Sequence, residues 1–133
     1  MNPVVIDCNV YISAFIGSDT CFKVIDKAFT EYRVCYSDAT YKELLETLHR
    51  PKFKNILKSQ RIAITLQILN ASGIFFRPAS CDIVLPDPDD RIYLDLAIAA
   101  HAEYIITGNK KHFPANLCKG VQVLSPIEFL QKA

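Results

Sequence analysis

The sequence has no excess of charge of either sign, because 15 lysine and arginine residues are balanced by 14 aspartate and glutamate residues, for a net charge of +1. This balance argues against a protein that coats nucleic acid through bulk charge, so any nucleic-acid site must be a local patch. The sequence also lacks an uninterrupted apolar stretch near the ~20 residues of a membrane helix. Asp7 interrupts the apolar N-terminus, and no basic leader precedes it, which disfavours a signal peptide. We expect a soluble protein with no membrane partner.

Paired cysteines are lacking as well. The five cysteines are odd in number and scattered, and no two of them form a Cys-x-x-Cys pair. This pattern disfavours both a disulfide framework and a zinc cage. We expect reduced, mostly buried thiols in a cytoplasmic protein.

Apolar residues, in contrast, are abundant. Half of the 133 residues are hydrophobic, which is enough for the core of one domain spanning residues 1–133. Short β-branched or apolar runs predict strands at 3–7, 33–37, 73–78, 103–107 and 121–124. Helical periodicity and capping residues predict helices from about 9, then at 19–29, 40–48, 56–70 and 91–102, and from 126. This alternation predicts an α/β sandwich with a mainly parallel central sheet.

The predicted helix IYLDLAIAAHA, residues 92–102, is apolar in every direction except at Asp95 and His101. An isolated ionised carboxylate in such a helix costs several kcal/mol unless it is paired, hydrogen-bonded or bound to metal. One interpretation of Asp95 is therefore a structural salt bridge or hydrogen bond.

A metal site is the other interpretation. Two predicted strands end in polar residues, one at Asp7 and one at Thr107, which Asn109 follows. In open α/β sheets the carboxyl ends of the strands form one rim, so Asp7 and Asn109 are expected there. If the Asp95 helix faces that rim, three oxygen donors converge, and oxygen donors favour Mg²⁺ or Mn²⁺ over zinc.

Three further acids stay ambiguous from the residues alone. Asp90, in the turn PDPDD, precedes the helix and suits either an N-cap or a site. Glu43 and Glu46 both lie away from the apolar stripe of the helix at 40–48, where a solvated face is the ordinary interpretation. Periodicity does not choose between them.

Three segments in this order, VVIDCNVYISAF, SDATYKELLETLHRPKF and DPDDRIYLDLAIAAHAEYIITGNKKHFP, resemble the PIN-domain family of metal-dependent ribonucleases. The chain is most similar to the VapC-like toxins of toxin–antitoxin modules. The resemblance covers almost the whole chain and implies a three-layer α/β/α fold. It also implies an acidic cluster that binds Mg²⁺ or Mn²⁺ and an activity that cuts RNA.

The resemblance assigns catalytic acids position by position. Asp7 matches the first acid, Glu43 the acid of the middle helix in preference to Glu46, and Asp95 the third acid. Asp90 matches an acid of the Asp-Pro-x-Asp turn found in a subgroup.

Metal ligands and supporting residues follow from the same match. The implied metal ligands are Asp7, Asp95, Glu43 and Asn109. Residues expected to hydrogen-bond or flank these carboxylates are Asn9, Ser13 and Thr107. Cys8 stands where many relatives have threonine, and Asn109 where many have aspartate. Asn109 lacks the negative charge of an aspartate, which weakens a second metal site. A single bound ion is therefore expected.

Substrate and partner sites are expected in the basic stretches. Arg50 and Lys52 lie beside Phe53, and Lys110 and Lys111 precede His112 and Phe113. Cations next to aromatic rings suit phosphate contacts and base stacking on single-stranded RNA. Solvated loops with inward-facing rings are the alternative. The resemblance adds a cognate antitoxin and a homodimer as expected partners.

Two other functions require acidic residues that the sequence lacks. A receiver-type phospho-accepting domain normally has adjacent acids after its first strand, but Cys8 and Asn9 follow Asp7 here. An aspartyl phosphatase of the haloacid dehalogenase type requires a second aspartate at position 9. A catalytically weak PIN-like scaffold that binds RNA or a partner remains open because of Asn109.

Overall fold

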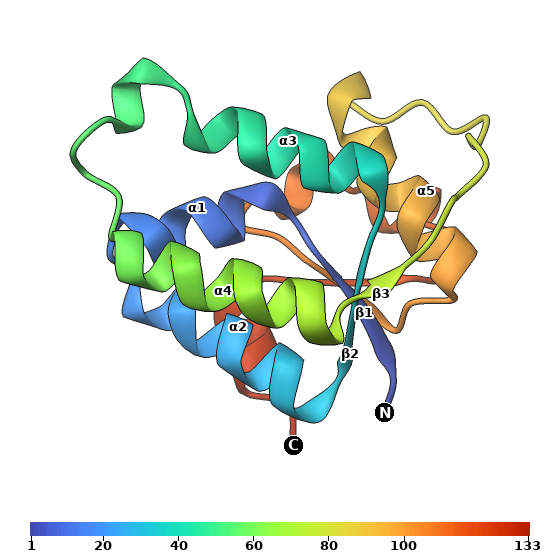
Figure 1. The fold of residues 1–133 in the computed structure, drawn as a ribbon. Helices are drawn as coiled ribbons and strands as arrows, with labels where there is room; N and C mark the ends of the chain where they lie inside the picture. The colour runs from blue at the N-terminus through green and yellow to red at the C-terminus, as the bar shows by residue number, and fades with distance from the viewer.

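The computed structural model describes residues 1–133 and contains five parallel strands in the order β3-β2-β1-β4-β5 (Figure 1). The strands are β1 (Pro3–Ile6), β2 (Arg33–Tyr36), β3 (Ile74–Phe75), β4 (Tyr104–Ile106) and β5 (Gln122–Leu124). Val4 of the central strand β1 aligns with Val34 of β2 on one side and with Tyr104 of β4 on the other. The predicted parallel sheet is confirmed, and all five of its strands are parallel.

Six α-helices cover the sheet. They are α1 (Cys8–Ile16), α2 (Asp19–Glu31), α3 (Asp38–Leu48), α4 (Ser59–Ser72), α5 (Arg91–Ala100) and α6 (Pro126–Leu130). Figure 1 shows α5 on the opposite side of the sheet from α1, α2 and α4. The α/β/α layering implied by the resemblance is confirmed.

Serine side chains begin several of these helices, as the sequence predicts. The hydroxyls of Ser18, Ser37 and Ser125 accept hydrogen bonds from backbone N–H groups in the first turns of α2, α3 and α6. Ser37 and Thr40 form a reciprocal capping box at α3.

The predicted start of the fourth helix at residue 56 is wrong, since α4 begins at Ser59. Asn55 takes a left-handed conformation with φ of 70°, which interrupts helical geometry. Lys58 then donates its backbone N–H to Phe15 O at 2.7 Å, which anchors the chain to α1 before the helix begins. Ile56 lies in the intervening turn and is exposed.

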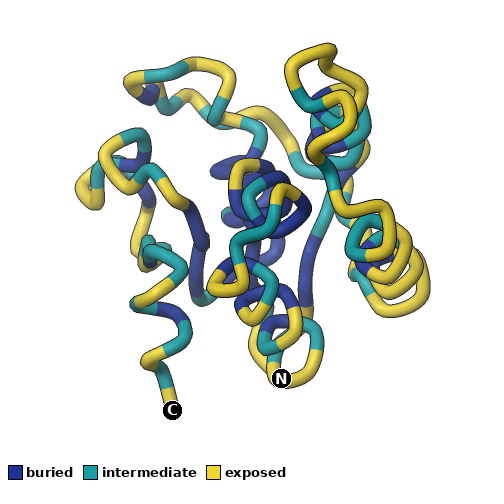
Figure 2. The backbone as a smooth tube through the Cα atoms, turned by 90° about the vertical axis from the view of Figure 1, so that its left-hand side faces the viewer, coloured by how far each residue is buried: buried dark blue, intermediate teal, exposed yellow.

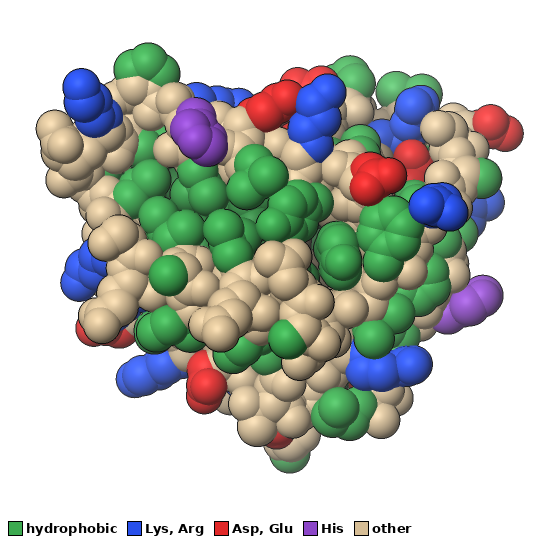
Figure 3. Space-filling model, viewed as in Figure 1, with side chains coloured by type: hydrophobic (Ala, Val, Ile, Leu, Met, Phe, Trp, Pro, Cys, Tyr) green, Lys and Arg blue, Asp and Glu red, His purple; other side chains and the backbone are tan.

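One cluster of 31 buried hydrophobic residues forms the core. Val4 and Val5 of β1 and Ile105 and Ile106 of β4 are fully buried, as expected for strands covered on both faces. Figure 2 shows the buried residues at the centre and the exposed ones on outer loops and outer helix surfaces. Apolar side chains also form a broad surface area on the face that carries α3 and α4 (Figure 3). None of the helices combines the length and hydrophobicity needed to cross a bilayer.

The strand order positions the site. From β1 the chain proceeds to β2 and β3 on one side, and it returns to form β4 and β5 on the other. The boundary between β1 and β4 is thus a topological switch point, where open α/β sheets bind ligands at the carboxyl ends. This order also differs from the 2-1-3-4-5 order of flavodoxin-like receiver domains.

Candidate functional site

A pocket opens where β1 ends and α1 begins, and α3, the turn before α5 and the loop after β4 complete its walls. We call it the acidic pocket because five acids line it: Asp7, Glu43, Asp87, Asp89 and Asp90. It therefore brings together three of the four predicted catalytic acids.

Asp7 is the most buried of these acids, with 5% of its surface exposed. Its backbone N–H continues the ladder by donating to Ile106 O of β4 at 2.9 Å. Two side chains donate to carboxylate oxygen Oδ2, Thr107 Oγ1 at 2.8 Å and Asn9 Nδ2 at 3.1 Å. No side chain donates to the other oxygen, Oδ1.

The electrostatic surroundings of Asp7 disfavour its charge. The pKa of Asp7 is raised to about 6, chiefly by burial and also by the negative charges of Asp90 and Glu43, against the opposing effect of hydrogen bonds from Thr107 and Asn9. A buried carboxylate surrounded by acids is stabilised in its ionised form by a cation.

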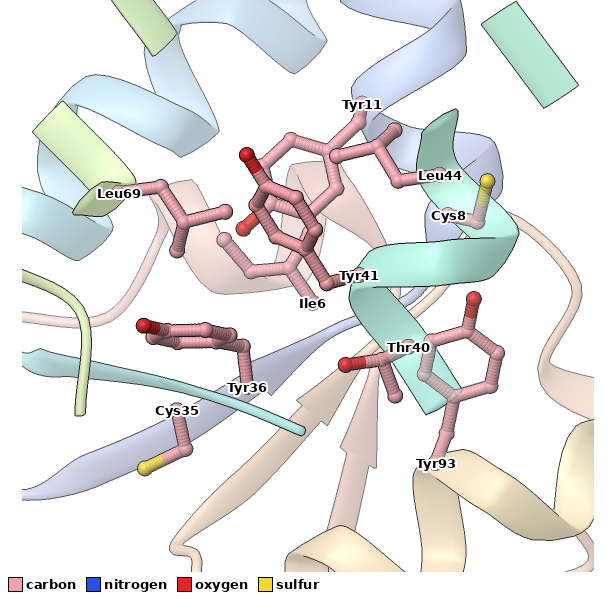
Figure 4. A pocket seen from close by; sticks show the side chains of 10 residues that line it. All are labelled: Ile6, Cys8, Tyr11, Cys35, Tyr36, Thr40, Tyr41, Leu44, Leu69 and Tyr93. Carbon is pink, nitrogen blue, oxygen red and sulfur yellow. The ribbon is translucent and has the colours of Figure 1, made fainter. Parts of the chain in front are cut away.

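Glu43 projects from α3 into the acidic pocket and accepts a 2.5 Å hydrogen bond on Oε1 from the Tyr93 hydroxyl. Tyr93 rises from α5 toward α3, close to Cys8 at the start of α1 (Figure 4). Glu46, the other candidate on this helix, is exposed and lies 3.8 Å from Lys42. The structure therefore distinguishes the two glutamates, which periodicity alone could not do.

Asp90 ends a short 3-10 turn (Pro88–Asp90) and sits at the N-cap position of α5. Its side chain makes no capping hydrogen bond there. The capping carboxylate of this segment is instead Asp87, whose Oδ1 accepts from Asp89 N at 3.0 Å. The side chain of Asp90 is thus available to the pocket.

One oxygen of Asp90 is buried without a hydrogen-bond donor. His112 Nδ1 lies 3.0 Å from Oδ2, near enough for an ion pair, but no N–H is aimed at this oxygen. Burial raises the pKa of Asp90, and the charges of Asp87 and Glu43 act in the same direction, while His112 lowers it. A buried acceptor without a donor is costly unless a cation or water contacts it.

Asp95 does not join the other acids, and its predicted role as a metal ligand with Asp7 is corrected here. It faces a different surface hollow, which includes Arg77 and Arg91. Its Oδ1 accepts from Cys81 N at 2.8 Å, and Oδ2 lies 3.8 Å from Arg91 Nε. The buried carboxylate therefore has structural partners, as the first interpretation expects, and the bond from Cys81 N joins the segment before α5 to this helix.

Neither Ser13 nor Asn109, two other predicted site residues, hydrogen-bonds a carboxylate of the pocket through its side chain. Ser13 lines the pocket, but its hydroxyl makes no hydrogen bond to a carboxylate. Asn109 does not line it, and its Nδ2 lies 3.0 Å from His112 Nε2. Its backbone N–H donates to Thr107 Oγ1, the hydroxyl that in turn donates to Asp7.

The predicted RNA-binding cations separate into two groups. Arg50 and Lys52 line the acidic pocket, and Lys52 Nζ lies 5.1 Å from the centroid of the Phe53 ring. Lys110 instead donates to Glu128 Oε1 at 2.8 Å. Lys111 is exposed outside the pocket.

The aromatic partners of these cations separate in the same way. Phe53 lines the pocket, whereas Phe113 is 2% exposed and packs in the core. Only the stretch around residue 50 combines cations and an aromatic ring at the pocket.

Sequence reasoning assigned no site role to Tyr93 or Asp87. The clustering of acids in PDPDD was a signal for Asp87. The sequence contains no such signal for Tyr93, because the pattern of an apolar helix does not show which of its residues contacts a carboxylate on another helix. Cys8 lines the pocket beside them, and burial raises the pKa of its thiol to about 11, which leaves it protonated at neutral pH.

The donor set fits a hard divalent cation. Asp7 has one oxygen to which no side chain donates, Asp90 has a buried oxygen without a donor, and Glu43 is held in position by Tyr93. Carboxylate oxygens of this kind are preferred ligands of Mg²⁺ and Mn²⁺.

Comparisons with known proteins give a family match and matches to solved structures. A family model described as PIN domain matches residues 3–111. A chain in the crystal structure of VapBC2 from Rickettsia felis, bound to a DNA fragment from their promoter, superposes with a TM-score of 0.63. The two share 16% sequence identity, and the alignment covers 92% of this chain and 98% of that chain. No curated protein matches in sequence.

Proposed function

Because this chain belongs to the PIN-domain family, we propose that it is a metal-dependent ribonuclease that hydrolyses RNA phosphodiester bonds in the acidic pocket. The proposal depends above all on the gathering of Asp7, Glu43 and Asp90 at the carboxyl end of the sheet. Asp95 has no part in it.

The proposed ligands of one Mg²⁺ or Mn²⁺ ion are Asp7, Glu43 and Asp90. When bound, such an ion lowers the pKa of a coordinated water and offsets negative charge on the scissile phosphate. Asp7 lines the pocket, and its Oδ1 is the proposed ligand because the Thr107 and Asn9 side chains bond to its other oxygen. Those two donors fix the carboxylate plane, which is the usual task of residues behind a metal ligand.

Glu43 has the second chemical role. With Oε1 held by the Tyr93 hydroxyl, the carboxylate of Glu43 keeps a second oxygen to orient a water or accept its proton. Burial raises the pKa of Tyr93 well above its usual range, so Tyr93 stays a neutral donor.

Substrate positioning falls to Arg50, Lys52 and Phe53, which line the same pocket. Two cations provide phosphate contacts, and the half-buried ring offers a surface for one unstacked base. This arrangement favours single-stranded or looped RNA, whose bases are free to turn outward.

Incubation of the pure protein with unstructured and structured RNA, with and without Mn²⁺, tests this function. We expect Mn²⁺-dependent cleavage that Asp7→Asn abolishes with an unchanged far-UV circular dichroism spectrum, while Asp26→Asn, an acid outside the pocket on α2, cleaves normally. Cleavage by Asp7→Asn at the wild-type rate would contradict the proposal.

The fold similarity to VapBC2 supports a finer proposal, that the chain is the toxin component of a toxin–antitoxin module in the cytoplasm. It would act as a homodimer and be silenced by a cognate antitoxin. Induced expression should then arrest growth, and Asp7→Asn should relieve the arrest. Growth arrest of equal strength by both forms would separate toxicity from nuclease activity.

A catalytically weak scaffold is the second candidate, and the position of Asn109 favours it. An amide stands there in place of a carboxylate and contacts His112 rather than the pocket. RNA binding without Mn²⁺-dependent cleavage would support this candidate.

A further inference from the structure

A mixed nitrogen and oxygen cluster lies beside the proposed ribonuclease ligands. Ligating atoms of Asp87, Asp90 and His112 all lie within 4.8 Å of one another. We propose that these three residues form a divalent-cation site with an imidazole ligand, and that this site binds Mn²⁺ in preference to Mg²⁺. The inference rests on the proposed function in one respect, because Asp90 belongs to both ligand sets.

The spacing of the cluster suits an ion. Neighbouring ligands on an octahedral ion with bonds of about 2.1 Å lie about 3.0 Å apart, and opposite ligands about 4.2 Å apart. His112 Nδ1 and Asp90 Oδ2 are separated by 3.0 Å, the distance of neighbouring ligands. A pair at the 4.8 Å limit must contract by about 0.6 Å to lie on opposite sides of one ion.

The burial of Asp90 gives an independent indication. Its Oδ2 is buried and receives no hydrogen bond, although an imidazole nitrogen lies beside it. Without a bound ion, the His112 imidazole lies beside this oxygen and makes no hydrogen bond to it. A divalent cation bound to both groups replaces that contact with two direct bonds and satisfies the buried oxygen.

Elements distant in sequence hold the cluster in place. Asp87 and Asp90 flank the 3-10 turn before α5, whose backbone Asp87 caps through Asp89 N. His112 belongs to another short turn (Lys110–His112) after β4. Asn109 contacts the other ring nitrogen, Nε2, and by turning its amide it can accept a hydrogen bond on Oδ1 from the Nε2–H group that metal binding at Nδ1 requires.

An imidazole ligand changes metal preference. Mg²⁺ favours oxygen ligands and water, whereas imidazole nitrogen favours transition metals, and Mn²⁺ ranks lowest among these in affinity. The site should therefore discriminate against Mg²⁺ by its nitrogen ligand. A site made only of carboxylates has no nitrogen ligand with which to select Mn²⁺ over Mg²⁺.

Pulsed electron paramagnetic resonance of the protein loaded with Mn²⁺ tests the inference directly, because ¹⁴N modulation of the echo reports a nitrogen bound to manganese. We expect ¹⁴N modulation in the wild type and in His49→Ala, and none in His112→Ala or His112→Gln. His49 is the matched control, an exposed histidine outside the pocket whose Nδ1 contacts Leu45 O. We further expect His112→Ala to lower Mn²⁺ affinity at least about tenfold, and Mg²⁺ affinity less.

Each outcome decides between the two proposals. Bound Mn²⁺ without ¹⁴N modulation in the wild type, or with modulation that persists in both His112 variants, overturns this inference and leaves the ribonuclease proposal standing. Absence of any Mn²⁺ binding overturns both. Circular dichroism of the two His112 variants checks that they are folded.

Discussion

The Tyr93 hydroxyl donates a 2.5 Å hydrogen bond to Glu43 Oε1, and this bond joins α5 to α3 at the wall of the acidic pocket. Tyr93 itself is 1% exposed. The buried Tyr93 hydroxyl therefore bonds to one oxygen of a glutamate that also lines the pocket. The bond positions Glu43 from inside the protein.

Tyr93→Phe should slow RNA cleavage about tenfold, because Glu43 loses the group that orients it. The free energy of unfolding should fall by about 1 kcal/mol for the lost hydrogen bond. Single-turnover cleavage and urea unfolding measure the two effects. Tyr41→Phe is the matched control, a half-buried tyrosine whose hydroxyl has no hydrogen bond in the structure, and it should leave cleavage unchanged. Equal rates for both variants would remove Tyr93 from the mechanism.

Asp95→Ala should lower the free energy of unfolding but leave the rate of RNA cleavage unchanged. Its carboxylate accepts from Cys81 N, so its removal leaves a backbone donor unpaired at a cost of about 1–3 kcal/mol. Asp95→Asn keeps an acceptor and should lose less. Urea unfolding ranks the three proteins, and cleavage per folded molecule should be equal among them. If a fully folded Asp95 variant cleaved RNA more slowly than the wild type, Asp95 would have to be counted among the catalytic acids.

The pKa of Asp7 predicts a pH-dependent stability in the metal-free protein. Because the pKa of Asp7 is about 6 in the folded state and its ordinary value is 3.8, the unfolded chain loses this proton first. The free energy of unfolding therefore falls as the pH rises from about 4 to about 6. The cost is fully absent below pH ~4 and reaches at most about 3 kcal/mol at neutral pH. Burial contributes most to this raised pKa, and the charges of Asp90 and Glu43 are part of it.

Asp7→Asn should therefore be more stable than the wild type at pH 7.5 without metal, and the difference should shrink at pH 4.5. Thermal unfolding in metal-free buffer at both pH values measures it. A variant that is less stable than the wild type at both would show that the hydrogen bonds from Thr107 and Asn9 outweigh the burial of charge.

Neutralising Arg50 and Lys52 should weaken RNA binding. The slope of log affinity against log salt concentration should become shallower by about 0.7 for each phosphate contact that is lost. Lys110→Ala/Lys111→Ala removes the same charge away from the pocket and should change the slope less, since Lys110 is paired with Glu128. Fluorescence anisotropy of a labelled RNA across a salt series compares the two pairs. Equal slopes would exclude a special role for the cations at the pocket.

The sequence was sufficient for the fold because apolar runs and helical periodicity report burial directly. The same reasoning placed Asp7 and Thr107 at one rim, since parallel strands share their carboxyl end. It failed at Asp95 because a buried carboxylate needs a partner, and periodicity does not reveal that the partner is a backbone N–H in the segment before α5.

The acids around α5 show a second limit. An aspartate before a helix is ordinarily a cap, yet Asp87 caps its own short turn and leaves the side chain of Asp90 free. The proximity of His112 to Asp90 depends on how two short turns meet in space. Neither turn has a periodicity from which that contact could be predicted.

Calorimetric titration of Mn²⁺ into the wild type, Asp90→Asn and Asp95→Asn tests the central claim most directly. The two variants remove the same charge from positions five residues apart, one inside the acidic pocket and one outside it. The account predicts that Asp95→Asn binds Mn²⁺ like the wild type and that Asp90→Asn loses binding. Undiminished binding by Asp90→Asn, or its loss in Asp95→Asn, would contradict the account.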